Sequence, residues 1–166
     1  MNHRTTSGTV DRGQFDFRGP ANEVARVSTL TLSAELRETI AAFLWGCLPH
    51  EGVGLLAASR MGSSLVAARF YPGRNTDSSS RRYTMDPADV LPALDDMKRK
   101  KTQLGAIVHS HPNTSPVPSW TDLVEARFPG VLSLIVGLSP VVELRAWYLL
   151  YGADGVAVGC EEVPIT

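Results

Sequence analysis

The sequence predicts a fold that contains both helices and strands, α/β (α+β). We expect one mixed β-sheet with helices packed around it. Three observations support this prediction. Segments of strand character and segments of helical periodicity alternate loosely along the chain. The length of 166 residues suits a single domain with a sizeable core. Hydrophobic residues make up 43% and charged residues 20% of the chain, which is ordinary for a globular protein.

The first elements follow a polar N-terminus. Residues 1–23 contain few apolar side chains, so we expect a flexible tail there and a single domain over residues 24–166. A strand is predicted at about residues 24–32, where Val, Thr and Leu are enriched. Ser33 is then expected to cap a helix, which Pro49 ends.

Two strands joined by a tight turn come next. The first is expected to begin at Glu51 and the second to cover residues 64–70, with Gly62 in the turn of a hairpin. Gly52 and Gly54 are unusual inside a strand. We expect them to permit another segment to approach the backbone closely.

A polar loop over residues 71–83 leads to a second helix, with Asp86 as its cap and Pro87 at its first position. This helix ends in the basic run 98–101. Two interpretations of the run stay open. It is either a solvated helix terminus, whose cations complement the helix dipole, or a docking patch for an acidic protein partner.

The second half of the chain is richer in strands. An apolar run at residues 104–108 predicts a buried strand, and a helix or turn is expected from 119 to about 127. The nearly continuous apolar run 131–138 is typical of a central strand. Residues 142–151 alternate and are rich in aromatic side chains, which predicts another strand before a last short segment.

Two histidines follow the strand at residues 104–108 directly. If the strand continues through them, His109 and His111 point to the same face and project side by side. The loop that follows ends at Ser119, an expected helix cap, which places Asp122 in the first helical turn. Two imidazoles and one carboxylate with a fourth position left open match a catalytic zinc site, so we expect one Zn²⁺ per chain.

The stretch resembles the JAMM family of zinc metalloproteases, also called MPN+ or Mov34/PAD-1. The motif of that family is an upstream Glu, then His-x-His, seven residues, Ser, two residues and Asp. The resemblance covers roughly residues 24–151 and implies the curved-sheet fold of the cytidine-deaminase-like and JAMM group. All five motif positions are present, as Glu51, His109, His111, Ser119 and Asp122.

The resemblance also implies how the site works. Glu51 would contact the zinc-bound water without ligating the metal, taking its proton as base and passing a proton to the leaving amine. Ser119 would donate a hydrogen bond to the oxyanion of the tetrahedral intermediate. We expect Trp120 to pack beneath the site.

The implied substrate is a ubiquitin-like or sulfur-carrier protein, hydrolysed at a peptide or isopeptide bond at its C-terminus. We favour compact prokaryotic enzymes that release amino acids such as cysteine from sulfur carriers. One alternative is an isopeptidase that removes ubiquitin-like modifiers from lysines. Two others are a hydrolase of cell-wall or phage-tail peptides and a non-catalytic scaffold of the MPN type.

Composition excludes other classes. With a net charge of −1, nothing points to nucleic acid or a membrane surface, and no apolar run approaches the ~20 residues that span a bilayer. The N-terminus lacks the apolar segment of a secretory signal. Cys47 and Cys160 lie far apart, so we expect reduced thiols in a cytoplasmic protein. The oligomeric state stays open.

Overall fold

The structure is a computed structural model, and it describes residues 26–166. The predicted tail over residues 1–23 therefore lies outside the described residues. The remaining chain alternates strands and helices in the expected order, with three helices and seven strands in the described part. They are β1 (Thr29–Thr31), α1 (Ala34–Gly46), β2 (Val53–Met61), β3 (Ser64–Gly73), α2 (Pro87–Arg99), β4 (Gln103–His111), α3 (Trp120–Glu125), β5 (Leu132–Gly137), β6 (Glu143–Tyr151) and β7 (Ala157–Val163).

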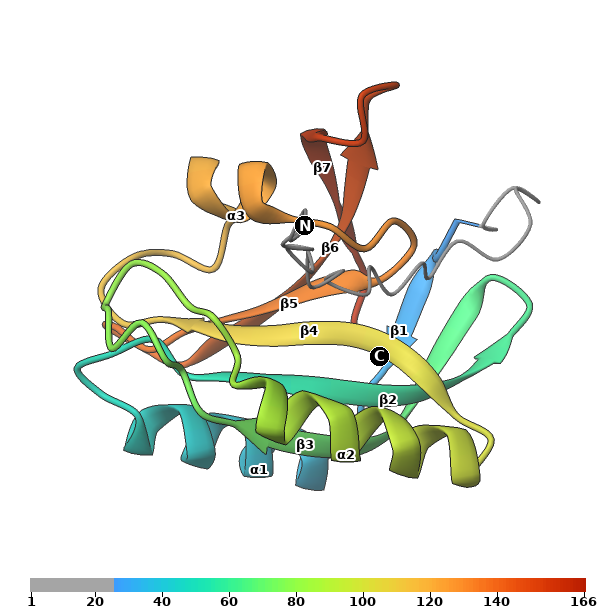
Figure 1. Ribbon diagram of the computed structural model, residues 1–166, viewed down its shortest axis with the longest axis horizontal. Coiled ribbons are helices and arrows are strands. Elements are labelled where there is room, and N and C mark those ends of the chain that lie inside the picture. The colour runs from blue at the N-terminus through green and yellow to red at the C-terminus, as the bar shows by residue number, and fades with distance from the viewer. Residues whose placement is uncertain (1–25) are drawn as a thin grey trace, which may run out of the picture.

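The strands form one mixed sheet in the order β1-β3-β2-β4-β5-β6-β7. The pairs β1–β3 and β4–β5 are parallel and the other four pairs are antiparallel. The two ends of the sheet meet, because the Leu30 backbone exchanges hydrogen bonds of 2.9 Å with Pro164 and Thr166. The predicted mixed sheet is confirmed, and it is curved as the resemblance implied (Figure 1).

Local sequence signals explain most element boundaries. Ser33 caps α1 and Asp86 caps α2 through their side-chain oxygens, as expected. Gly62 has a φ of +62° in the turn between β2 and β3, a conformation that glycine adopts readily. Several boundaries differ from the predictions, and β3 runs three residues beyond the expected end at residue 70. The first strand is limited to the three residues of β1, and Glu51 precedes β2 instead of beginning it.

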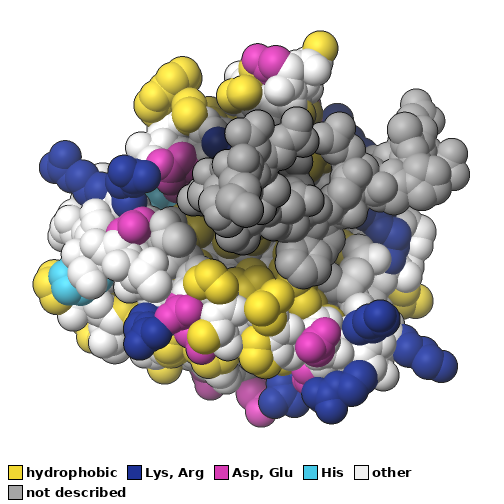
Figure 2. All heavy atoms as spheres, viewed as in Figure 1, with side chains coloured by type: hydrophobic (Ala, Val, Ile, Leu, Met, Phe, Trp, Pro, Cys, Tyr) yellow, Lys and Arg dark blue, Asp and Glu magenta, His cyan; other side chains and the backbone are white. Residues whose placement is uncertain are grey.

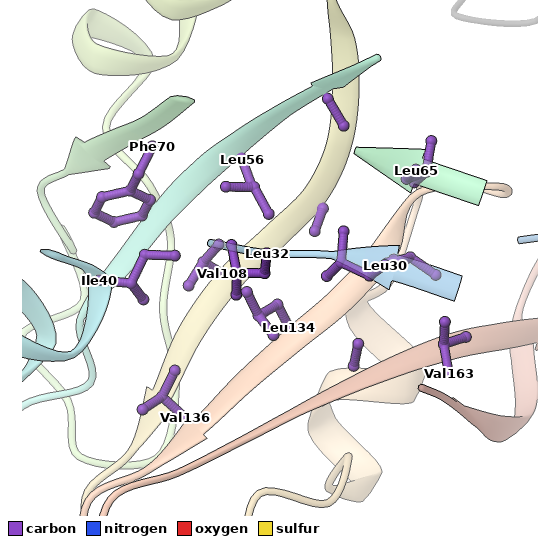
Figure 3. Close-up of a cluster of buried hydrophobic side chains, with 14 of the residues drawn as sticks. Leu30, Leu32, Ile40, Leu56, Leu65, Phe70, Val108, Leu134, Val136 and Val163 are labelled. Atoms are coloured by element: carbon purple, nitrogen blue, oxygen red, sulfur yellow. The ribbon is translucent and has the colours of Figure 1, made fainter. Parts of the chain in front are cut away.

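The main core lies between the sheet and α1. Ile40 and Leu44 of α1 are fully buried there against side chains of β2, β4 and β5, such as Leu56, Val108 and Leu134 (Figure 3). Gly54 permits part of this packing, since a Cβ there would lie 2.4 Å from the Phe70 ring.

The other face of the sheet carries α2 and α3. Met97 of α2 packs on Leu55 of β2, and Leu123 of α3 packs on Ile135 and Trp147. Because side chains alternate along a strand, these residues point away from the main core. The two helices stand apart on this face, with β4 and β5 running between them (Figure 1). Two of the predicted metal ligands, His109 and His111, lie at the end of β4, and the third, Asp122, lies on α3.

Candidate metal centre

The two histidines project from the end of β4 as the alternation predicts. His109 and His111 are 0% and 4% exposed, and their Nε2 atoms lie 3.3 Å apart. Ser110 between them points to the opposite face, where its hydroxyl accepts the Gly52 N–H at 2.8 Å. Strand β4 thus presents two imidazole nitrogens to one point.

The loop after β4 holds the His111 ring in place. The His111 Nδ1 atom lies 2.8 Å from the Ser115 carbonyl oxygen, which can only accept a hydrogen bond. Two contacts fix the loop itself. Trp147 Nε1–H donates to the Pro116 carbonyl at 2.8 Å, and the Pro116 ring packs against Gly137. His111 therefore carries a proton on Nδ1, which leaves its Nε2 facing His109 and Asp122.

The third predicted ligand, Asp122, lies on α3. The Ser119 hydroxyl accepts the Asp122 N–H at 3.2 Å, and Asp122 Oδ2 accepts the Ser119 N–H at 2.6 Å, which forms a capping box. The same carboxylate places Oδ1 at 3.2 Å from His109 Nε2 and Oδ2 at 3.3 Å from His111 Nε2. The cap thus aims the carboxylate at both imidazoles.

The donor set fits zinc. Zn–N bonds of about 2.0–2.1 Å at tetrahedral angles put two ligand nitrogens about 3.3–3.4 Å apart. The two histidine nitrogens and the nearest carboxylate oxygens lie at such separations, and the three ligand atoms all fall within 4.8 Å of one another. Three converging ligands match a catalytic zinc site better than a closed structural one.

The surroundings favour the protonation states in which two of these groups bind metal, a neutral imidazole for His109 and a carboxylate for Asp122. Burial lowers the pKa of His109, which favours its neutral imidazole. Burial alone would raise the pKa of Asp122, but hydrogen bonds from His109 and His111 outweigh it and hold the pKa below its usual range. Burial also opposes charge on His111, yet hydrogen bonds to Asp122 and Ser115 raise its pKa. Metal binding would therefore displace a proton from this cluster.

Glu51 lies beside the cluster and outside the ligand group. It is 5% exposed, its Oε2 has no hydrogen-bond partner among the described residues, and burial raises its pKa to about 7. Its backbone is anchored on both sides, since its N–H donates to the Ser79 carbonyl at 2.8 Å and its carbonyl accepts the Asn75 side-chain amide at 2.9 Å. A buried carboxyl with a pKa near neutrality suits proton transfer.

Ser119 and Trp120 lie at the rim of the site. The Ser119 residue is exposed, and its cap contact uses an oxygen lone pair, so its O–H remains available to donate. Trp120 is 78% exposed, so the expectation that it packs beneath the site is wrong. As the first residue of α3, it follows the cap and points outward instead of toward the sheet.

Tyr83 is a site residue that the sequence did not indicate. Its ring lies against His109, with 4.6 Å between the ring centroids. Burial of its hydroxyl, together with the Asp122 and Glu51 charges, raises the pKa of Tyr83, so it stays a neutral phenol. The residue comes from the polar loop over residues 71–83, which has no periodicity that would relate it to β4.

A groove leads away from the centre across the sheet. It has a volume of about 1020 Å³, and its floor is formed by side chains of β2 and β4 such as Val53, Leu55 and Ile107. One wall is α2, and α3 with the segment after it forms the other. Both Asp122 and Lys98 line the groove. Figure 2 shows hydrophobic side chains along α2 on this face, with Lys and Arg side chains toward its C-terminal end.

The basic run that ends α2 is solvent-exposed from Lys98 to Lys101. Arg99 and Lys100 both pair with Asp96, at 3.1 and 2.6 Å. These contacts fit the interpretation as a solvated helix terminus. In the residues that the structure describes, no helix is long and apolar enough to cross a membrane.

The chain is similar to a known protein family and to named enzymes. The family described as prokaryotic homologues of the JAB domain matches residues 33–150. A desampylase from Haloferax volcanii is 32% identical over 125 residues, which cover 72% of this chain and 88% of that protein. A probable TtuB-protein conjugate cleaving protease from Thermus thermophilus is 34% identical over 122 residues, which cover 73% of this chain and 68% of that protein.

A solved structure is similar as well. The solution structure of a protein from Desulfitobacterium hafniense matches with a TM-score of 0.70 and 32% sequence identity. The match covers 82% of this chain and 91% of that one. The chain therefore resembles that protein in both sequence and fold.

Proposed function

The chain belongs to the family of prokaryotic homologues of the JAB domain, and we propose that it is a zinc-dependent hydrolase acting at the C-terminus of a ubiquitin-like or sulfur-carrier protein. The observation that carries this proposal is the convergence of His109, His111 and Asp122 next to a buried Glu51. We assign residues 24–166 to one catalytic domain.

Three side chains would hold the metal. They are the Nε2 atoms of His109 and His111 and one carboxylate oxygen of Asp122. When bound there, zinc supplies Lewis acidity that makes a water molecule nucleophilic near neutral pH. One zinc per chain is expected.

Glu51 and Ser119 would carry out the proton transfer and the charge stabilisation. Glu51, as a carboxylate, accepts the proton of the attacking water while a new C–O bond forms at the substrate carbonyl. The Ser119 hydroxyl donates a hydrogen bond to the oxyanion that develops on that carbonyl. Glu51 then gives the proton to the leaving nitrogen as the C–N bond breaks. The products are a free carboxylate and an amine.

The relatives favour protein conjugates as substrates. One of them is named as a protease that cleaves TtuB–protein conjugates, and by analogy we propose an isopeptide bond to lysine as one substrate of this chain. Release of a single amino acid from a sulfur carrier is the other form of the same reaction. The retained ligand set argues against a non-catalytic scaffold. Free Cys47 and Cys160 agree with the proposed cytoplasmic location.

Intact-mass analysis tests the proposal. Zinc-loaded protein would be incubated with TtuB bearing one extra C-terminal cysteine and with TtuB linked to the lysine of a peptide. Loss of the peptide identifies a deconjugating isopeptidase, and loss of the cysteine identifies an amino-acid-releasing hydrolase. The proposal fails if zinc-replete protein cleaves neither these substrates nor the same pair built on other ubiquitin-like carriers.

A further inference from the structure

The second ring nitrogen of His109 has no hydrogen bond in the part of the chain that the structure describes. The residue is 0% exposed, and its Nδ1 is a buried atom without a partner there. The neighbouring His111 differs, since its Nδ1 lies 2.8 Å from the Ser115 carbonyl oxygen. Metal-binding histidines usually donate their second ring N–H to such an acceptor, which fixes the orientation of the ring. A different contact must hold the His109 ring.

Tyr83 supplies that contact. Its ring lies against the His109 ring, with 4.6 Å between the centroids and 30° between the planes. This separation is at the close end of the range for stacked aromatic rings. Tyr83 lies in the loop between β3 and α2, outside any helix or strand. Its position therefore depends on the contacts that hold this loop.

Asn75 holds the loop on both sides of Tyr83. Its side-chain nitrogen donates to the Arg82 carbonyl at 3.0 Å, and its side-chain oxygen accepts the Thr84 N–H at 3.1 Å. Arg82 and Thr84 are the residues immediately before and after Tyr83. One side chain therefore fixes the backbone that carries the stacked ring.

The same side chain holds the segment that carries the proposed base. The Asn75 nitrogen also donates to the Glu51 carbonyl at 2.9 Å, and its oxygen also accepts the Asp77 N–H at 3.0 Å. An asparagine side chain has two donor hydrogens and an oxygen with two lone pairs, so these four contacts use its whole hydrogen-bonding capacity. An aspartate could not make them all, because it has no hydrogen to donate.

We propose that Asn75 is a positioning residue for the hydrolysis, which fixes Glu51 directly and His109 through the Tyr83 ring. This inference rests on the proposed function. Proton transfer requires the Glu51 carboxylate at a set distance from the metal ligands. A displacement of about 1 Å can cost about 100-fold in rate, so Asn75 affects the reaction without touching the substrate.

The sheet alone does not fix these two side chains. Strands β2 and β4 pair with Val53 opposite His109, which sets the backbone of both. Glu51, however, lies before β2 and outside this pairing. The pairing also leaves the orientation of the His109 ring open, because a side chain rotates about its own bonds. The contacts of Asn75 and Tyr83 supply what the sheet does not.

Zinc affinity tests the link to His109 without any substrate. Tyr83→Leu removes the stacked ring and Asn75→Ala releases its backbone, and each should lower the affinity by about tenfold or more. Tyr83→Phe keeps the ring and should bind zinc nearly as wild type does. In the double variant Asn75→Ala/Tyr83→Leu the two losses should not add, because both act through the same ring. Competition with a chelator measures each affinity.

Kinetics at saturating zinc test the link to Glu51. With TtuB linked to the lysine of a peptide, Asn75→Ala should lower kcat by about 100-fold. KM should change by less than about twofold, since Asn75 does not line the groove. Thr76→Ala is the matched control in the same loop. It removes a 3.1 Å hydrogen bond to the Thr84 carbonyl, which keeps the Thr76 N–H at 2.9 Å, so kcat and zinc affinity should stay close to wild type.

Urea unfolding would first establish that each variant is folded. If Asn75→Ala does not fold, Asn75→Asp, which keeps both accepted hydrogen bonds and loses both donated ones, replaces it in the kinetic measurement. Equal zinc affinities in Tyr83→Leu and Tyr83→Phe, or additive losses in the double variant, would overturn the link to His109. An unchanged kcat in the Asn75 variant would overturn the link to Glu51. A protein that cleaves no carrier but loses zinc affinity in Tyr83→Leu would overturn the proposed function alone.

Discussion

The burial of Glu51 suits its proposed role as a base but lowers the stability of the folded protein. Its pKa is raised from 4.5 to about 7 because the carboxylate is buried, and this makes the folded state hold a proton that the unfolded chain has lost. The free energy of unfolding therefore falls as pH rises from 4.5 to 7, and the whole cost is present above pH 7. Natural active sites commonly retain residues that lower the free energy of unfolding.

Replacing Glu51 with Gln should remove that cost. In the metal-free protein at pH 8, Glu51→Gln should raise the free energy of unfolding by an amount on the order of 1–3 kcal/mol, measured by urea denaturation. The difference should vanish below pH 4.5, where the carboxyl is protonated in both states. A variant that is less stable than wild type at pH 8 would contradict the burial of an uncompensated carboxylate.

In the proposed mechanism, Glu51 also sets the decline of activity at acid pH. Since Glu51 must be ionised to accept a proton, kcat/KM should decline about tenfold per pH unit once the pH falls below the pKa of Glu51, which burial raises and a bound zinc ion would lower. The measurement is a pH–rate profile on one conjugate, with zinc content checked at each pH. A profile that stays flat down to about pH 4 would exclude Glu51 as the base.

At the scale of elements, α3 is a six-residue helix whose cap also orients Asp122, a proposed metal ligand. Ser119→Ala should cost about 1 kcal/mol of stability through the lost cap. It should also weaken zinc affinity, because Asp122 loses one of the contacts that fix its position. Zinc titration with a competing chelator measures this effect. Ser119→Thr, which preserves the capping oxygen, is the matched control and should bind zinc nearly as wild type does.

Gly54 of β2 permits close packing that a substitution can test. A Cβ at Gly54 would lie 2.4 Å from the Phe70 ring and 2.7 Å from the Tyr71 carbonyl oxygen. Gly54→Ala should therefore destabilise the protein by about 1–3 kcal/mol, measured by thermal or urea unfolding. Gly46→Ala, where a Cβ would meet nothing within 4 Å, is the control and should unfold close to wild type.

Elements with local signals were predictable, and contacts between distant elements were not. The alternation at His109 and His111 and the cap at Ser119 follow from a few neighbouring residues, so both were predicted before the fold was known. Glu51 came only from the resemblance, because nothing local relates it to β4. The contacts of Tyr83 with His109 and of Arg82 with Glu125 depend on how a loop without periodicity folds over the sheet.

The whole molecule should respond to the metal. Zinc at about 100 times its Kd would stabilise the folded chain by about 2.7 kcal/mol, because the ligands converge only in the folded state. For a domain of this size, removal of the metal should lower Tm by about 5–10 °C. Calorimetry with and without chelator measures this shift. His109→Ala should show no such shift, and an equal shift in that variant would place the metal elsewhere.

One measurement tests the central assignment most directly. Zinc content and cleavage of a TtuB–lysine conjugate would be determined on the same samples of wild-type and Glu51→Gln protein. We predict about one zinc per chain in both proteins and cleavage only by wild type, because the ligands are retained and the base alone is removed. Near-normal cleavage by Glu51→Gln, or a folded wild-type protein that binds no zinc, would contradict this account.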